Sequence, residues 1–216
     1  SEDPSNRCRL VLVVPPLENA EALLAAAIKG GDIASIILPN KDMSESAYQD
    51  HVEALTKLAQ ANDIAVIVQD DSQAMGRSGA DGTFVASEIE ALKETLARFS
   101  PKRIVGYGGV RTRHNAMEAA ELYPDFLFLG KLDGDIKPEA HPKNVALAQW
   151  ASELMQVSII VMGGSTLEST IDVAKSGAEF VALSLAVFSH VDGPEAAVSL
   201  ANQLLEDHSV RFDDEA

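Results

Sequence analysis

This 216-residue chain has almost no cysteine and no long apolar run. Cys8 is its one cysteine, so no disulfide can form within the chain, which favours a reducing compartment. No apolar run reaches the ~18 residues of a membrane-spanning helix. The first residues, SEDPSNR, lack the apolar core of a signal peptide. We therefore expect a cytoplasmic protein.

Positive charge is also in short supply. The chain has 17 Lys and Arg against 33 Asp and Glu, a formal net charge of −16. Nucleic acids and anionic membranes are bound mainly through Lys and Arg, so neither is an expected partner. A small anionic ligand would be repelled by the molecule as a whole and would need a local positive site.

Short apolar runs rich in Val, Ile and Leu recur, each followed by an amphipathic stretch. They lie at residues 10–14, 33–38, 64–68, 83–86, 103–107, 126–129, 158–162 and 180–185. Such continuously apolar runs are typical of strands buried on both faces of a parallel sheet. Eight strand–helix units predict a single (β/α)8 TIM-barrel domain over residues 1–216, with flexible ends at 1–8 and 207–216. A doubly wound open sheet is the alternative.

Two segments that precede predicted strands share the pattern Gly-Ala-acid. They are Gly79-Ala80-Asp81 and Gly177-Ala178-Glu179. We interpret both as turns in which a glycine ends the preceding helix, because glycine tolerates the left-handed conformation found there.

The stretch IIVMGGST, residues 159–166, predicts a strand that ends in two glycines and a helix that starts at Ser165, with Glu168 completing a capping box. Barrels often bind phosphate between the loops after strands seven and eight, where N–H groups point outward. The hydroxyl of Ser184 would be a second donor. We therefore predict a phosphate site at Gly163, Gly164 and Ser184, with a purely structural turn as the alternative.

Three segments carry a resemblance to a known family. The sequences ADG (80–82), VMGGS (161–165) and SGAEFVALSLAVFS (176–189) resemble the thiamine phosphate synthase and TenI superfamily, and the similarity runs over nearly the whole chain. The resemblance implies a (β/α)8 barrel of thiamine biosynthesis. Its synthases join a thiazole phosphate to hydroxymethylpyrimidine diphosphate with Mg²⁺, whereas TenI proteins act on the thiazole phosphate as tautomerases.

The motifs that carry catalysis in that family are only partly present. Residues 37–42 (ILPNKD) stand where the synthases have Gln-Leu-Arg-x-Lys-Asp, so Lys41 remains to hold the diphosphate. Asp70 keeps one Mg²⁺ carboxylate, while the second falls at Ile89. The Thr-x-Thr-Lys diphosphate loop is replaced by residues 135–138 (DIKP). Each lost contact weakens the stabilisation of a departing diphosphate.

The resemblance leaves several activities open. Lys131 stands where TenI proteins have a His and would move the proton in a tautomerase, whereas a synthase would use Lys41 and Mg²⁺ at Asp70. A non-catalytic barrel that binds thiazole phosphate or thiamine phosphate is another alternative. The last is an unrelated phosphate barrel, such as a sugar-phosphate epimerase. The expected partner is a small phosphorylated heterocycle, and the sequence does not distinguish transferase, isomerase or binder, nor monomer from homodimer.

Overall fold

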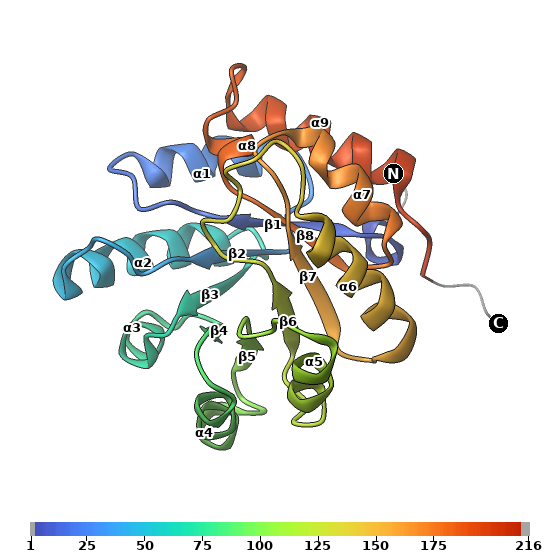
Figure 1. The fold of residues 1–216 in the computed structure, drawn as a ribbon. Helices are drawn as coiled ribbons and strands as arrows, with labels where there is room; N and C mark the ends of the chain where they lie inside the picture. The colour runs from blue at the N-terminus through green and yellow to red at the C-terminus, as the bar shows by residue number, and fades with distance from the viewer. Residues whose placement is uncertain (1–2, 213–216) are drawn as a thin grey trace.

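The computed structural model describes residues 3–212 and shows eight parallel strands closed into a barrel in the order β1 to β8 (Figure 1). The strands are β1 (Arg9–Val13), β2 (Ser35–Leu38), β3 (Ala65–Gln69), β4 (Gly82–Val85), β5 (Ile104–Tyr107), β6 (Phe126–Leu129), β7 (Ser158–Met162) and β8 (Phe180–Leu183). The pairing of β1 with β8 closes the sheet, which confirms the TIM barrel and excludes the open doubly wound sheet.

Helices surround the barrel and alternate with the strands (Figure 1). They are α1 (Ala20–Ile28), α2 (Glu45–Gln60), α3 (Ser72–Ser78), α4 (Ile89–Phe99), α5 (Arg113–Ala120), α6 (Pro142–Leu154), α7 (Thr170–Lys175), α8 (Leu185–Phe188) and α9 (Gly193–His208). Two 3₁₀ turns, Pro4–Asn6 and Leu167–Ser169, complete the fold. No helix within residues 3–212 is long and apolar enough to span a bilayer.

The strands are apolar on both faces because each face is buried by a different partner. Alternate residues point inward, where Val11, Val13, Ile37 and Ile67 belong to one core cluster that fills the barrel. Their neighbours along the strands belong to a larger cluster that packs against the helices. The continuous apolar runs of the sequence therefore correspond to two separate cores, as in other parallel sheets covered by helices.

Three phenylalanines occupy much of the barrel interior. Phe84 lies 6.2 Å from Phe126 and 5.3 Å from Phe128, measured between ring centroids. Gly106 makes room for this layer, since a Cβ at that position would overlap the ring of Phe126. The aromatic layer fills the interior below the mouth of the barrel, and Phe84 also lines the cavity at that mouth.

The two Gly-Ala-acid segments are turns, as predicted. Gly79 ends α3 with φ 74°, and Gly177 follows the end of α7 with φ 91°. Both values lie in the left-handed region that glycine favours. The acidic residues have a further role that the sequence did not reveal: Asp81 accepts a hydrogen bond from Val66 N–H at 2.8 Å, and Glu179 accepts one from Ile159 N–H.

The predicted capping box is absent. The side chain of Ser165 does not cap a helix, and the segment begins instead with a 3₁₀ turn that starts after Thr166. In a capping box the N–H of Ser165 would donate to the side chain of Glu168. Here that N–H donates instead to the carbonyl of Lys137 at 2.9 Å, and the hydroxyl of Thr166 donates to the carbonyl of Pro138. The short helix α8 was also missed; it begins at Leu185, the last residue of the run predicted as strand eight.

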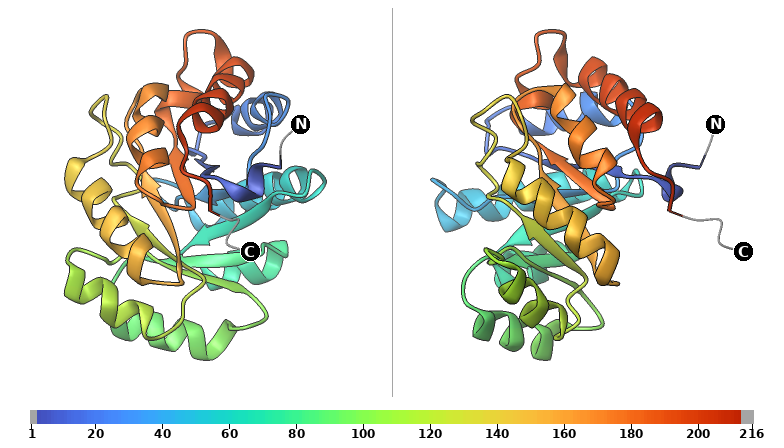
Figure 2. Two further views of the ribbon diagram at one scale, coloured as in Figure 1. Left: turned by 90° about the vertical axis from the view of Figure 1, so that its right-hand side faces the viewer. Right: turned by 45° about the vertical axis from the view of Figure 1, so that its right-hand side comes forward.

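The predicted flexible ends include residues 1, 2 and 213–216, which lie outside the described part of the chain. Within it, Arg7 and Cys8 are buried, and Phe212 N–H donates to the carbonyl of Asn6 at 2.9 Å. The N-terminal segment and the end of α9 therefore lie side by side (Figure 2). Arg7 adds an ion pair with Glu206 at 2.7 Å.

Candidate functional site

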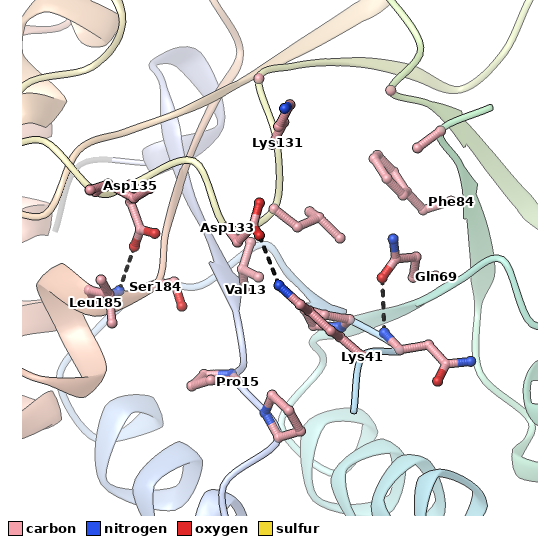
Figure 3. A pocket seen from close by; sticks show the side chains of 18 of the residues that line it. Val13, Pro15, Lys41, Gln69, Phe84, Lys131, Asp133, Asp135, Ser184 and Leu185 are labelled. Carbon is pink, nitrogen blue, oxygen red and sulfur yellow. Dashed lines mark hydrogen bonds and ion pairs between the residues drawn. The ribbon is translucent and has the colours of Figure 1, made fainter. Parts of the chain in front are cut away.

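A cavity of about 600 Å³ opens at the carboxyl ends of the strands. Its walls come from every strand end except that of β7, as in barrel enzymes generally, where the chemistry lies at this end. The lining residues drawn and labelled in Figure 3 are Val13, Pro15, Lys41, Gln69, Phe84, Lys131, Asp133, Asp135, Ser184 and Leu185. The floor is apolar and the rim is charged, an arrangement suited to a ring that carries a charged substituent.

Lys41 and Lys131, the two predicted catalytic lysines, both line this cavity. Lys41 pairs with Asp133 across the mouth, with 3.2 Å between Nζ and Oδ2, and both side chains are about two-thirds exposed (Figure 3). Lys131 makes no ion pair with any residue in the part of the chain that the structure describes. The positive charge of Lys131 is thus available to a ligand, whereas that of Lys41 is already partly neutralised.

Arg111 adds a third cation from the loop after β5. Its Nη1 donates to the carbonyls of Gly108 and Val110 at 3.2 and 3.0 Å, so the loop fixes the base of the guanidinium. Gln69 forms another contact between loops, because its Oε1 accepts from Asn40 N–H at 2.9 Å. These contacts hold the loops after β2, β3 and β5 in place around the cavity.

The three predicted phosphate-binding residues are placed differently. Ser184 lines the cavity, whereas Gly163 and Gly164 do not. The N–H of Gly163 donates to Ala182 O at 2.8 Å, and that of Gly164 donates to Ser169 Oγ at 2.9 Å. A Cβ on Gly164 would overlap the backbone of Pro138, so glycine is required there because a neighbouring loop approaches closely. Phosphate binding at the two glycines stays a prediction.

Asp70, the predicted Mg²⁺ ligand, faces away from the cavity. It is the first residue after β3 and has a left-handed backbone with φ 44°, so the chain turns away from the strand direction at this point. Asp70 accordingly lines a separate cavity of about 250 Å³ with Arg98 of α4, and desolvation there raises the pKa of its carboxyl. A raised pKa opposes the ionised form that Mg²⁺ requires.

The residues present do not fit the Mg²⁺ site that the family resemblance implies. Ile89, at the position of the second metal carboxylate, packs against the hydrophobic core. Within residues 3–212 no group of three His, Cys, Asp or Glu side chains is close enough to hold a metal ion. We therefore derive no catalytic step from Mg²⁺ at Asp70.

Asp135 is the cavity residue whose placement the sequence did not predict. Its side chain is only 3% exposed, and its Oδ2 accepts from Leu185 N–H at 2.8 Å (Figure 3). Asp133, two residues earlier in the same loop, is instead exposed. Nothing in the local sequence distinguishes the two acids, because the contact that buries Asp135 comes from a residue 50 positions away.

Sequence comparisons identify the family. The profile described as thiamine monophosphate synthase matches residues 10–187. The chain belongs to this family. The thiamine-phosphate synthase of Rhodospirillum centenum is 35% identical over 204 residues, which cover 92% of this chain and 98% of that protein. That of Hyphomonas neptunium is 30% identical, over 94% of this chain and 96% of its own length.

Solved structures show the same barrel. The thiamine phosphate pyrophosphorylase of Pyrococcus furiosus has a TM-score of 0.77 and 20% identity, covering 95% of this chain and 98% of that one. A tryptophan synthase from M. tuberculosis has a TM-score of 0.68 at 14% identity, covering 95% and 94%. Barrels of different activities therefore resemble this chain, and membership of the thiamine monophosphate synthase family rests on the sequence relatives.

Proposed function

We propose that this member of the thiamine monophosphate synthase family acts in thiamine biosynthesis by binding a thiazole phosphate in the mouth cavity. The observation that carries the proposal is the cavity itself. Its floor, which includes Val13 and Phe84, offers apolar and aromatic surface to a heterocycle. Ser184, Lys131 and Arg111 on its walls offer a hydroxyl and positive charge to a phosphate.

The charges around the cavity suit one phosphate better than a diphosphate. Of the three lining cations, Lys41 is paired with Asp133, which leaves Lys131 and Arg111 beside the lining acids Asp42 and Asp135. Two cations can offset one phosphate better than two, and they act locally in a chain whose formal net charge is −16. A thiazole phosphate is therefore the better-matched first ligand.

We propose coupling of the thiazole phosphate to hydroxymethylpyrimidine diphosphate as the reaction, in line with the named relatives. In that role Lys41 would hold the diphosphate. Its ion pair with Asp133 would break when the negatively charged diphosphate enters. A second function, thiazole tautomerisation or binding without turnover, is favoured by one observation: Asp70 faces away from the cavity and Ile89 replaces the second carboxylate. In a tautomerase, Lys131 would move the proton.

Calorimetric titration distinguishes these functions. The wild-type chain is titrated with the thiazole phosphate and then with the pyrimidine diphosphate, each with and without Mg²⁺. Binding of both ligands, followed by formation of thiamine phosphate, supports the synthase. Binding of the thiazole phosphate alone supports the second function, and absence of binding by either ligand contradicts the proposal.

Lys131→Gln tests the placement of the ligand. Because this cation lines the cavity and has no acidic partner among the described residues, its loss should weaken thiazole phosphate binding by about tenfold, or about 1.4 kcal/mol. Lys137→Gln is the matched control, since Lys137 is exposed on the same loop but does not line the cavity. Equal losses in the two variants would point to long-range charge rather than to this site.

A further inference from the structure

The loop between β6 and α6, residues 130–141, folds over the ends of β7 and β8. Its backbone carbonyls at Lys137 and Pro138 accept hydrogen bonds from the N–H groups of Ser165 and Thr166, at 2.9 and 3.4 Å. The hydroxyl of Thr166 also donates to Pro138 O at 2.8 Å. Donors after β7 that would otherwise face a ligand are thus bonded to the protein's own loop.

The same loop places a carboxylate beside the end of β8. Asp135 is 3% exposed, and its one hydrogen bond to the described residues comes from Leu185 N–H at 2.8 Å. It forms no ion pair with the residues at 3–212, although the cations Lys131 and Arg111 line the same cavity. A carboxylate this buried without a cation is unusual, because desolvation of the charge is costly.

A second observation marks this corner of the cavity as a ligand position. Ser184 lines the cavity, and its hydroxyl forms no hydrogen bond to the described residues and is open to the cavity. Such a hydroxyl can donate to a ligand in the cavity. Ser184 lies next to the Asp135–Leu185 contact (Figure 3). A hydroxyl open to the cavity and an N–H bound to a carboxylate therefore belong to adjacent residues, Ser184 and Leu185.

We propose that Asp135 occupies the position of the ligand's anionic group and selects against a phosphorylated ligand until the loop opens. The inference rests on the proposed function and adds its regulation. A carboxylate and a phosphate use the same donors, and placing them together is unfavourable because like charges repel in a partly desolvated cavity. A phosphorylated ligand must therefore displace Asp135 from Leu185 N–H, whereas an uncharged ring can enter beside it.

Asp135→Asn tests this directly, because the amide keeps the size and one oxygen acceptor of the side chain while removing its charge. The variant should bind the thiazole phosphate at least ~tenfold more tightly than wild type. Binding of the corresponding unphosphorylated thiazole alcohol should not change. Glu139→Gln is the matched control: it removes the same charge from an exposed position on the same loop and should leave both affinities unchanged.

Asp135→Glu separates the charge from the shape of the loop. Glutamate keeps the negative charge but does not reproduce the position of the aspartate oxygens, so it should not gain affinity for the thiazole phosphate. A gain equal to that of Asp135→Asn would overturn the proposal, because loosening of the loop would then explain both results. Thermal unfolding of each variant confirms that the barrel is intact.

Inorganic phosphate, titrated into the same proteins, separates failure of this inference from failure of the proposed function. If wild type and Asp135→Asn bind the thiazole phosphate equally, the function stands and the inference is wrong. If neither binds it but only Asp135→Asn binds inorganic phosphate, the inference stands and the ligand is a different phosphorylated molecule. If neither protein binds either probe, both proposals are wrong.

Discussion

The two ends of the barrel use the same hydrogen bond in different surroundings. At the amino end, the carboxylates of Asp81 and Asp125 each accept from the N–H of a residue in a neighbouring strand, Val66 and Val105, at 2.8 Å. At the carboxyl end, Asp135 accepts from Leu185 N–H at the same distance. The chemistry is equal, but the donors differ in exposure: Val66 and Val105 are fully buried, whereas Leu185 is 42% exposed and lines the mouth cavity.

The difference lies in what replaces each contact when it is lost. Val66 and Val105 are fully buried in the sheet, so an N–H group that loses its acceptor there is costly. Leu185 itself lines the mouth cavity, where a phosphate or water can take the place of the carboxylate. We infer that the amino-end contacts stabilise the barrel, whereas the Asp135 contact can be exchanged for a ligand.

Asp81→Ala should produce the largest loss of stability. The substitution leaves the partly buried Val66 N–H without its side-chain acceptor, which should lower the free energy of unfolding by about 2 kcal/mol. Urea unfolding measures the loss, and Asp50→Ala, at an exposed position of α2, is the control. Thiazole phosphate binding should not change. If Asp81→Ala lost no more unfolding free energy than Asp50→Ala, the amino-end hydrogen bonds would not be structural.

Asp135→Ala should cost less, even though it removes a hydrogen bond of the same length. Leu185 lines the mouth cavity, so water can take the place of the lost carboxylate at its N–H. We expect the free energy of unfolding to fall by no more than about 1 kcal/mol. Urea unfolding beside Asp81→Ala tests the distinction between the ends directly, since equal losses would show that both contacts are structural.

The fold was predictable from the sequence because its strongest signal is local. Parallel strands buried on both faces leave continuous apolar runs, and all eight runs correspond to barrel strands. The exception is the run at residues 180–185, where the strand ends at Leu183 and α8 begins at Leu185. A short apolar run does not reveal by itself where a buried strand gives way to a buried helix.

The candidate site was only partly predictable. Lys41, Lys131 and Ser184 line the cavity because each directly follows a strand, and strand ends converge at the barrel mouth. The orientation of Asp70 was missed because the chain leaves β3 at this residue with φ 44°, and the sequence does not reveal such a turn. The burial of Asp135 depends on a loop that meets a distant part of the chain, which local sequence does not encode.

Glu179→Gln should change how stability depends on pH. Desolvation raises the pKa of the Glu179 carboxyl above its ordinary 4.5, partly offset by the hydrogen bond from Ile159 N–H. The folded state therefore keeps the proton to higher pH than the unfolded chain does, so stability is full below pH 4.5 and falls as pH rises through the folded pKa. The glutamine variant lacks this fall.

Urea unfolding of wild type and Glu179→Gln from about pH 4 to pH 7 measures the effect, which should be a fraction of a kcal/mol. The variant should gain stability relative to wild type as the pH rises. Glu153→Gln, at an exposed position of α6, should show no such trend. A relative gain for Glu179→Gln on acidification instead would mean that the hydrogen bond from Ile159, rather than desolvation, dominates at this acid.

Lys41→Met should have the smallest effect on stability and so sharpen the division between the ends. Its ion pair with Asp133 joins two side chains that are 65% and 67% exposed, and such pairs contribute only about 0–1 kcal/mol. Urea unfolding should show a change within about 0.5 kcal/mol. If the chain couples the two substrates, thiamine phosphate formation by the same variant should fall far more, because Lys41 would hold the diphosphate. An unchanged rate of thiamine phosphate formation would show that Lys41 takes no part in the reaction. A large loss of unfolding free energy would show that this rim residue has a structural role.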